Sequence, residues 1–378
     1  MDNAKTAYVI SCSDHYGHRL NVIADYLRSK GYEVTYITSD FDHTSKQSFL
    51  CSVPGCVQIH ARSYRKNLSF DRIISHQMFA RDVFRYLDGL AHQPDVVVAL
   101  IPPNFLAYYG AKYKKKHPGV YLIFDIFDMW PETFPFGKVK KLLTPVFGVW
   151  AWIRNHNLSA ADYVITECEM FRELLELPQE KSQTVYLCAD SLAIPQVHTS
   201  LREDKLELCY LGAINNVIDI PAICALVYQL VKERPVTLHV IGKGERQQEL
   251  IEELKAVGAE VVFYGAVYDE QKKRDIISKC HFGLNMMKSS VCVGLTMKSV
   301  DYFRFGLPII NNIPSDTQNL IEQYGIGIQC TDECSRKILG LSMQDCLNMR
   351  ANVKNVFETI FEKSVAIDQY RQLFDKTL

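Results

Sequence analysis

The feature that most constrains this chain is an alternation of short apolar runs with amphipathic stretches, which runs through the first half and then starts again. In the first half, buried strands are predicted at 7–12, 33–38, 95–101, 120–124 and 163–166, and a helix at 16–30. In the second half, strands are predicted at 206–211, 237–241, 260–264, 281–285 and 308–311, and helices at 221–232 and 247–256. Repeated strand–helix–strand order predicts an α/β chain with two doubly wound, Rossmann-like domains.

The stretch between the two patterns predicts where the domains divide. Residues 189–205 are polar, contain Pro195 and show no clear periodicity. We therefore expect an N-terminal domain at 1–190, a linker at 191–205 and a C-terminal domain at 206–352. The last stretch, 353–378, has helical periodicity, and we expect it to pack back on the N-terminal domain.

Composition excludes several classes of protein. Lys and Arg number 42 against 43 Asp and Glu, so the chain lacks the basic excess that nucleic-acid binding needs. The 12 cysteines include no paired CxxC units, which argues against structural zinc, and many free thiols indicate a reducing compartment. The start is polar, unlike a signal peptide, and no apolar run reaches the roughly 18 residues of a membrane span. We expect a cytoplasmic protein.

One segment, 293–315, carries the strongest indication of a ligand. A loop with Gly294, Leu295 and Thr296 opens a predicted helix that ends at Gly306. Amide groups at a helix start, with Lys298 in the first turns, suit a diphosphate, and Asp301 could accept hydrogen bonds from ribose hydroxyls. The alternative is a capped surface helix with a salt bridge between Lys298 and Asp301.

Glycines also end the neighbouring predicted strands. Glycine allows the backbone to approach a phosphate or a planar base closely, although a tight strand-to-helix turn would use the same residues. The candidate nucleotide-binding residues here are Gly212, Gly242, Lys243, Gly244, Tyr264, Gly265 and Val267.

The 293–315 segment resembles the nucleotide-sugar site of GT-B glycosyltransferases, in particular glycosyltransferase family 4. Gly294 and Leu295 match the loop of that family, and Asp301 takes the place of its ribose-binding glutamate. Gly306 and Pro308 match its Gly-x-Pro. The segment is most similar to a bacterial subset that builds capsule, O-antigen and other surface polysaccharides and includes galactofuranosyl- and glucosyltransferases.

This resemblance implies two domains facing each other across a cleft, with a UDP-sugar bound by the second domain and no cofactor or metal. It also implies retention of the anomeric configuration. Two departures matter: Val293 stands where the family has its first glutamate, and Ala213 follows Gly212 where the family has basic residues. The diphosphate then depends on Lys298, which we also expect to act in catalysis.

The first domain holds the candidate acceptor residues. Tyr16, Gly17 and His18 lie between a strand and a helix and resemble an acceptor-side loop of the family. Asp125 and Asp128 follow another strand, and either could orient an acceptor hydroxyl as a catalytic residue, or simply cap a turn.

Two basic stretches suggest an anionic, lipid-linked acceptor. Arg62 and Lys66 belong to the cluster 60–67, which could hold a diphosphate-linked lipid or could be a solvated loop. Residues 138–154 combine basic and aromatic side chains at helical spacing, as in helices that lie on a membrane, although part could be core.

We therefore predict a glycosyltransferase that moves a sugar from a UDP-sugar to a lipid-linked saccharide at the inner face of the cytoplasmic membrane. The alternatives are a sugar-nucleotide epimerase on the same fold and a non-catalytic partner of another enzyme. The sequence leaves open whether the chain forms a homodimer.

Overall fold

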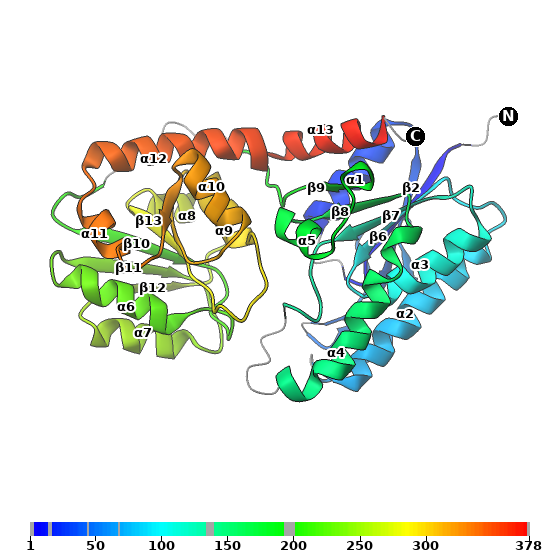
Figure 1. The fold of residues 1–378 in the computed structure, drawn as a ribbon, viewed down its shortest axis with the longest axis horizontal. Coiled ribbons are helices and arrows are strands. Elements are labelled where there is room, and N and C mark those ends of the chain that lie inside the picture. Colours follow the sequence, from blue (N-terminus) through cyan, green and yellow to red (C-terminus); the bar gives the residue numbers. More distant parts are fainter. Residues whose placement is uncertain are drawn as a thin grey trace. The chain divides into compact units, whose positions relative to one another are not determined.

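The structure is a computed structural model that describes residues 4–13, 17–43, 45–66, 69–133, 140–192 and 201–375, without side chains at 17, 18 and 140–144. The chain forms two compact units (Figure 1). Unit 1 comprises Met1–Tyr186 and Ala366–Leu378, and unit 2 comprises Leu187–Val365. Of the predicted linker, 193–200 lie outside the described residues, and the predicted domain limits stay predictions.

Unit 1 is built on a parallel sheet of seven strands. In spatial order the strands are β5 (Val57–Ile59), β2 (Glu33–Ser39), β1 (Thr6–Ile10), β6 (Val96–Ile101), β7 (Tyr121–Ile126), β8 (Tyr163–Thr166) and β9 (Ser182–Thr184). A small hairpin pairs β3 (Phe41–Asp42) with β4 (Gln47–Ser48). The helices are α1 (Gly17–Ser29), α2 (Phe70–Asp88), α3 (Phe105–Lys116), α4 (Lys140–Asn155), α5 (Glu169–Leu174) and most of α13 (Lys363–Phe374), with 3-10 turns at Leu158–Ala160 and Gln179–Lys181.

Helices cover both faces of this sheet, which explains why its central strands are apolar throughout. All six residues of β6 are buried. Figure 1 shows α2, α3 and α4 together on one face and α1 with α13 on the other. On that second face, Tyr26 of α1 stacks on Phe374 of α13 with ring centroids 5.3 Å apart. A sheet enclosed in this way needs continuous runs of Val, Ile and Leu, which is the pattern that the sequence offers.

Unit 2 repeats the plan with six parallel strands. Their spatial order is β12 (Glu260–Gly265), β11 (Val236–Ile241), β10 (Leu206–Leu211), β13 (Phe282–Asn285), β14 (Ile309–Asn311) and β15 (Gly327–Gln329). The helices are α6 (Ile220–Val231), α7 (Gln247–Ala256), α8 (Glu270–Ile277), α9 (Met297–Arg304), α10 (Asp316–Tyr324), α11 (Cys334–Leu339) and α12 (Met343–Val356), followed by a π-helical turn at Phe357–Phe361.

The two sheets confirm the predicted fold class. In each sheet the strand order reverses beside the first strand, between β1 and β6 in unit 1 and between β10 and β13 in unit 2. Open parallel sheets bind ligands at the carboxyl ends of the strands at such a reversal. The fold thus singles out one edge in each unit as the place to look for a site.

Candidate functional site

A buried tyrosine parts the central strands of unit 2 at their carboxyl ends. Strands β10 and β13 pair only at Leu208↔Phe282 and Cys209↔Gly283. Beyond that point the Tyr302 hydroxyl accepts a hydrogen bond from the Leu211 amide at 2.7 Å and lies 3.1 Å from the Cys209 carbonyl oxygen. A Cβ on Gly283 would lie 2.6 Å from the Tyr302 ring, so the glycine makes room for it. The gap between the strands is thus built into the fold.

The loop before α9 is held rigidly at this gap. The Thr317 amide and hydroxyl both donate to the Gly294 carbonyl, at 2.9 and 2.6 Å. Thr296 caps α9 by accepting from the Ser299 amide, and its hydroxyl donates to buried Asn285 at 3.0 Å. Leu295 is buried in the core. Predicted loop residues Gly294, Leu295 and Thr296 therefore form a preorganised start for the helix. The helix ends at Arg304 with Phe305 as its C-cap, and Gly306 (φ 67°) follows in the left-handed conformation that terminates helices.

Lys298 lies in the first turn of α9 and carries the positive charge of this edge. Its side chain is half-buried, with the ammonium 4.7 Å from the centre of the Tyr210 ring. Burial lowers the pKa of Lys298 to about 8, and among the described residues no carboxylate contributes to that shift. An ammonium that no described carboxylate pairs with, placed beside amide donors, suits an anionic ligand. Asp301 is half-buried on the same helix.

Two of the predicted nucleotide-binding glycines are required by chain packing. A Cβ on Gly242 would lie 1.9 Å from the Gly212 carbonyl oxygen, and one on Gly244 would lie 2.1 Å from that of Ile214. Hydrogen bonds join the same loops, from the Gly212 amide to Ile241 and from the Ile214 amide to Lys243. The Gly-x-Gly sequence therefore holds the end of β11 against the end of β10, and contact of these glycines with a nucleotide stays a prediction.

The end of β12 has a similar arrangement. Gly265 has φ 67°, and its carbonyl oxygen accepts a hydrogen bond from the Gly242 amide at 2.8 Å. The Lys243 side chain is exposed, with its Cε 3.3 Å from the Cβ position of Gly265. Val267 is half-buried just beyond the strand. These backbone groups stay candidates for a ligand.

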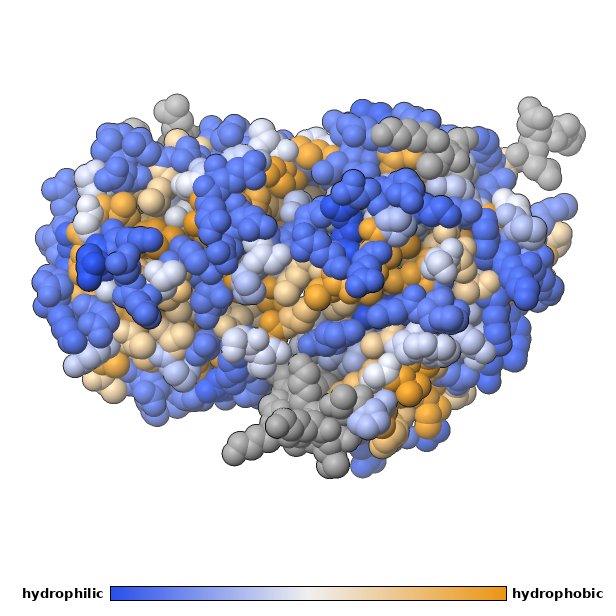
Figure 2. All heavy atoms as spheres, viewed as in Figure 1, coloured by the Kyte–Doolittle hydropathy of each residue, from blue (hydrophilic) through white to orange (hydrophobic). Residues whose placement is uncertain are grey.

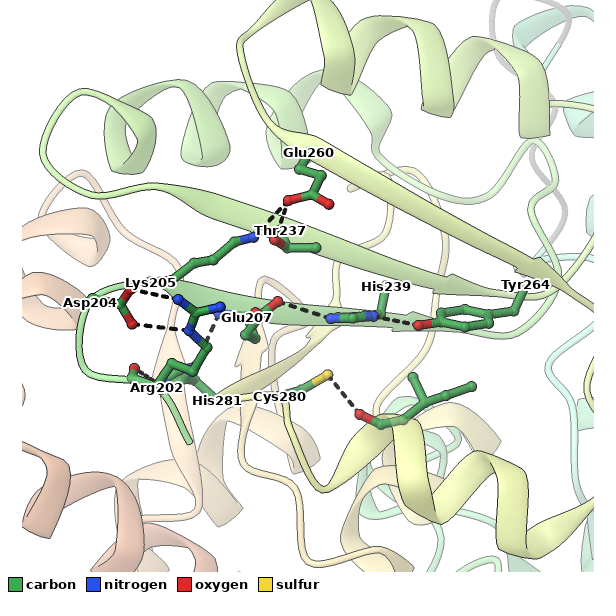
Figure 3. A network of polar contacts seen from close by, with 11 residues as sticks. Arg202, Asp204, Lys205, Glu207, Thr237, His239, Glu260, Tyr264, Cys280 and His281 are labelled. Carbon is green, nitrogen blue, oxygen red and sulfur yellow. Dashed lines mark hydrogen bonds and ion pairs between the residues drawn. The ribbon is translucent and has the colours of Figure 1, made fainter. Parts of the chain in front are cut away.

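The Tyr264 side chain is committed to a polar ladder along the sheet. Figure 3 shows its hydroxyl directed toward His239, whose other ring nitrogen meets Glu207; the two contacts are each 2.9 Å. His281 joins Glu207 from the neighbouring strand end, where its Nδ1 accepts the Glu207 amide at 3.1 Å. This contact leaves the Tyr264 hydroxyl further hydrogen-bonding capacity, so both its ring and its hydroxyl stay candidates for a ligand.

Sequence reasoning missed two further cations near this edge. Lys288 is half-buried after β13, and its amide donates to Val217 in the loop after β10 at 2.9 Å. Arg246 follows the Gly-x-Gly segment and is joined to Glu249. Only the pairing of the two loops brings Lys288 near the gap, and nothing in the local sequence around Lys288 indicates it.

In unit 1, a pocket lies at the carboxyl ends of the central strands. Its floor comes from residues that follow four strands: Cys12 after β1, Ser39 at the end of β2, Pro102 after β6 and Phe127 after β7. The equivalent edge of unit 2 is made largely of backbone, whereas this one is walled by side chains. The pocket lies where the strand order of unit 1 reverses, as expected for a binding site.

Aromatic and basic side chains form the wall of this pocket. The Arg72 guanidinium lies 4.1 Å from the centre of the Trp130 ring, and His76 stacks on the same tryptophan with an interplanar angle of 12°. Tyr64 meets His76 edge to face. Trp130 is fixed in turn by its backbone, since Asn104 and Arg154 both donate to its carbonyl, at 2.9 and 2.7 Å.

The two predicted catalytic carboxylates of unit 1 differ in access. Asp125 is fully buried and forms two 2.8 Å contacts with Arg19, which also donates to the Val185 carbonyl. Burial opposes the charge of Arg19, but Asp125 raises the pKa of Arg19 above its ordinary value. This burial and pairing favour a structural role for Asp125, and its catalytic role stays a prediction. Asp128 is half-buried beside the pocket, accepts from the Trp130 indole at 2.6 Å and has its pKa raised by burial.

Of the predicted acceptor-side residues, the described side chains of Arg62 and Lys66 do not line the pocket. Arg62 is exposed and pairs with Asp71 at 3.1 Å, and Lys66 is exposed. Tyr16 lies outside the described residues, as does the side chain of His18. The backbone of Gly17 and His18 begins α1. From the basic cluster 60–67, Tyr64 lines the pocket. Arg72 and His76 of α2 line it as well.

Comparison with known proteins agrees with this architecture. The structure superposes on the lipopolysaccharide outer core galactosyltransferase WaaB with a TM-score of 0.67 at 15% identity, covering 99% of this chain and 100% of that one. HepE from Anabaena with UDP-glucose gives a TM-score of 0.63 at 13% identity (99% and 100%). MurG from Acinetobacter baumannii gives 0.55 at 11% identity (99% and 100%). The chain has the GT-B fold.

A family comparison by sequence points the same way. Residues 205–338 match the family Glycosyl transferases group 1. This stretch contains every nucleotide-binding residue that the sequence predicted in unit 2. Among curated proteins, no sequence matches the chain.

Two further features of the described residues bear on function. None of their helices has both the length and the apolar character needed to cross a bilayer. They also contain no group of three or more His, Cys, Asp or Glu side chains placed to hold a metal ion.

Proposed function

We propose that this GT-B chain is a glycosyltransferase that moves a hexose from a UDP-sugar, bound by unit 2, to a saccharide acceptor bound by unit 1. The observation that carries the proposal is Lys298, a half-buried ammonium in the first turn of α9 beside the gap between β10 and β13. A UDP leaving group develops negative charge on its diphosphate as the sugar departs. A fixed cation and helix-end amides stabilise that charge more in the transition state than in the ground state.

The relatives support the choice of donor. HepE has been solved with UDP, with UDP and glucose, and with UDP-glucose. The group 1 match covers the part of this chain that holds Lys298 and Asp301. We propose that Asp301 binds the ribose, that no metal or cofactor takes part, and that the configuration of the sugar is retained.

We further propose a lipid-diphosphate-linked acceptor in bacterial surface-polysaccharide synthesis, reached from the cytoplasmic face of the membrane. Apolar side chains are exposed on α4, where Val149 is 60% and Trp152 58% exposed, and on α2, where Phe70 is 70% exposed. Figure 2 shows apolar atoms gathered at the lower right, where Figure 1 places these two helices. Such side chains insert into the interfacial region of a bilayer.

Calorimetry with UDP tests the donor site. We expect wild-type protein to bind UDP and Lys298→Met to bind it about tenfold or more weakly, since one charge-assisted contact is lost. Lys272→Met is the matched control, because Lys272 is an exposed lysine of unit 2 on α8. Equal UDP affinity in wild type and Lys298→Met, or no UDP binding by the folded wild type, would contradict the proposal and favour the non-catalytic alternative.

A product analysis separates the enzymatic alternatives. UDP-glucose and other UDP-hexoses are incubated with and without a lipid-linked acceptor, and both UDP release and the identity of the sugar nucleotide are followed. A transferase releases UDP in an acceptor-dependent manner and leaves the remaining donor unchanged. Conversion of the donor to an epimer without acceptor would establish the epimerase instead.

Vesicle sedimentation tests the membrane contact. We expect wild type to sediment with vesicles that contain anionic lipid and Trp152→Ser to sediment less. Leu174→Ser is the control, because Leu174 is 53% exposed on α5 of the same unit. An equal loss of sedimentation in both variants would mean that α4 is not the surface that binds the membrane.

A further inference from the structure

The pocket of unit 1 contains a buried imidazole, one nitrogen of which has no hydrogen-bond partner among the described residues. His76 is 5% exposed and lines the pocket. Its Nδ1 has no hydrogen-bond partner among the described residues. Burying a polar atom without a partner costs free energy, and native structures rarely tolerate it unless a ligand or a water completes the site. This atom is therefore a point at which a ligand would be bound.

The cation beside His76 is also deeply placed. Arg72 is 6% exposed, and its guanidinium lies over Trp130 at 4.1 Å and 5.8 Å from the centre of the Tyr64 ring. Stacking on an aromatic face leaves the N–H groups of a guanidinium directed outward in its own plane, which is the geometry that binds carboxylate and phosphate. Lys46 approaches the same Tyr64 ring at 4.7 Å.

The charge of Arg72 dominates the surroundings of the pocket. After burial itself, Arg72 is the largest influence on the pKa values of Cys12, Tyr64 and His76, and in each case it lowers them. Burial and the Arg72 charge also lower the pKa of Lys46, and the effect of Arg72 there is larger than the opposing effect of Asp42. Among the described residues, the Asp42 carboxylate accepts from the Ser45 hydroxyl at 2.7 Å, and the Asp128 carboxylate accepts from the Trp130 indole at 2.6 Å. Of the side chains that are described as lining the pocket, none is acidic, and Arg72 brings a positive charge to it.

We propose that this pocket binds an oxyanion, a carboxylate or phosphate carried by a saccharide, through Arg72, Tyr64 and His76. The assignment of that saccharide as the acceptor rests on the proposed function; the binding site itself stands on the geometry of unit 1. Tyr64 and His76 supply directional hydrogen bonds and Arg72 the charge, and Trp130 fixes the orientation of both Arg72 and His76. The pocket would then select acidic acceptors over neutral ones.

Tryptophan fluorescence gives a direct assay, because all three tryptophans of the chain, Trp130, Trp150 and Trp152, belong to unit 1. The full chain is titrated with methyl glucuronide, glucose 6-phosphate and methyl glucoside. We expect the acidic probes to bind about tenfold or more tightly than the neutral one, as one charge-assisted interaction provides. Preference for the glucuronide assigns the site to a uronic acid, and preference for the phosphate assigns it to a phosphorylated saccharide.

Variants locate the binding. Arg72→Gln and His76→Asn should each lose the preference for acidic probes, whereas Arg85→Gln, a 70% exposed arginine of the same helix, should keep it. Tyr64→Phe removes only a hydroxyl and keeps the ring, so it tests the site even if Arg72→Gln fails to fold. Equal binding of acidic and neutral probes by wild type, or an unchanged preference in Tyr64→Phe and His76→Asn together, would overturn the proposal.

A second measurement keeps this inference separate from the proposed function. UDP binding by calorimetry reports on unit 2, and the tryptophan signal reports on unit 1. Acidic probes that bind while UDP does not would leave the oxyanion site standing and remove the transferase. Transfer from a UDP-sugar to a neutral acceptor, with no binding of acidic probes, would leave the transferase standing and remove the oxyanion site.

Discussion

The two units share one strand order but use opposite means to shape the edge where a ligand would bind. In unit 2 the edge is built from backbone, with Gly242 and Gly244 packed directly on the carbonyls of the neighbouring loop. In unit 1 the corresponding edge is walled by the large side chains of Arg72, His76 and Trp130. A backbone edge can offer the same amides to any UDP-sugar, whereas a side-chain edge can change with each acceptor. The difference fits a common donor and a specific acceptor.

The largest effect should come from the ion pair that supports the side-chain edge. In Asp125→Asn the buried Arg19 loses its counter-charge, and we expect unit 1 to lose about 3–5 kcal/mol of unfolding free energy. Denaturant unfolding followed by tryptophan fluorescence measures unit 1 alone. Asp71→Asn breaks a pair whose side chains are 52% and 56% exposed and should cost no more than about 1 kcal/mol. A stable Asp125→Asn protein without transferase activity would support the catalytic interpretation of Asp125 instead.

The next effect tests the tight backbone packing at the carboxyl ends of β10 and β11 in unit 2. Gly242→Ala places a Cβ 1.9 Å from a carbonyl oxygen at a residue with φ 151°. We expect a loss of about 3 kcal/mol, seen as faster hydrogen exchange of β10 and β11, together with weaker UDP binding. Gly119→Ala, which meets nothing within 4 Å, should leave both unchanged. Normal exchange with loss of UDP binding alone would mean that Gly242 serves the ligand rather than the fold.

A smaller effect concerns the wedge between the central strands. Tyr302→Phe keeps the ring but leaves the buried Leu211 amide without its acceptor. We expect a cost of about 1–2 kcal/mol, with increased hydrogen exchange confined to β10 and β13. Tyr228→Phe on α6 removes a hydroxyl from a tyrosine that is 48% exposed and should change nothing. Unchanged exchange in Tyr302→Phe would show that the strands part without the hydroxyl.

The same contrast explains what the sequence could predict. The sheets follow from local runs of apolar residues, and the 293–315 segment is continuous, so β10–β14 and the α9 cap were all visible in order along the chain. The pocket of unit 1 draws on Cys12, Tyr64, Arg72 and Trp130, which only the folded chain brings together. The partner of Asp125, Arg19, lies 106 residues away in the chain, so the sequence could not show that this carboxylate is held in an ion pair.

The finest test of the comparison is the pH dependence of the donor site, where a single side-chain charge supplements the backbone edge. Burial lowers the pKa of Lys298 from 10.5 to about 8, so the ammonium that attracts UDP is lost as the pH rises through 8. We expect the UDP affinity to fall about threefold between pH 7.5 and 8.5, in step with the fraction of charged lysine.

The stability of the ligand-free protein should move in the opposite direction. Because the folded state binds this proton less tightly than the unfolded state, the contribution of Lys298 to stability is complete above pH 10.5 and is lost as the pH falls through about 8.

The control for the pH dependence of UDP affinity is Lys298→Met. Any titration of UDP itself affects this variant and the wild type equally, so only the wild type should show the threefold fall in affinity. If the step persists in Lys298→Met, the charge that holds the diphosphate lies elsewhere, and Lys288 beside the same gap becomes the residue to change.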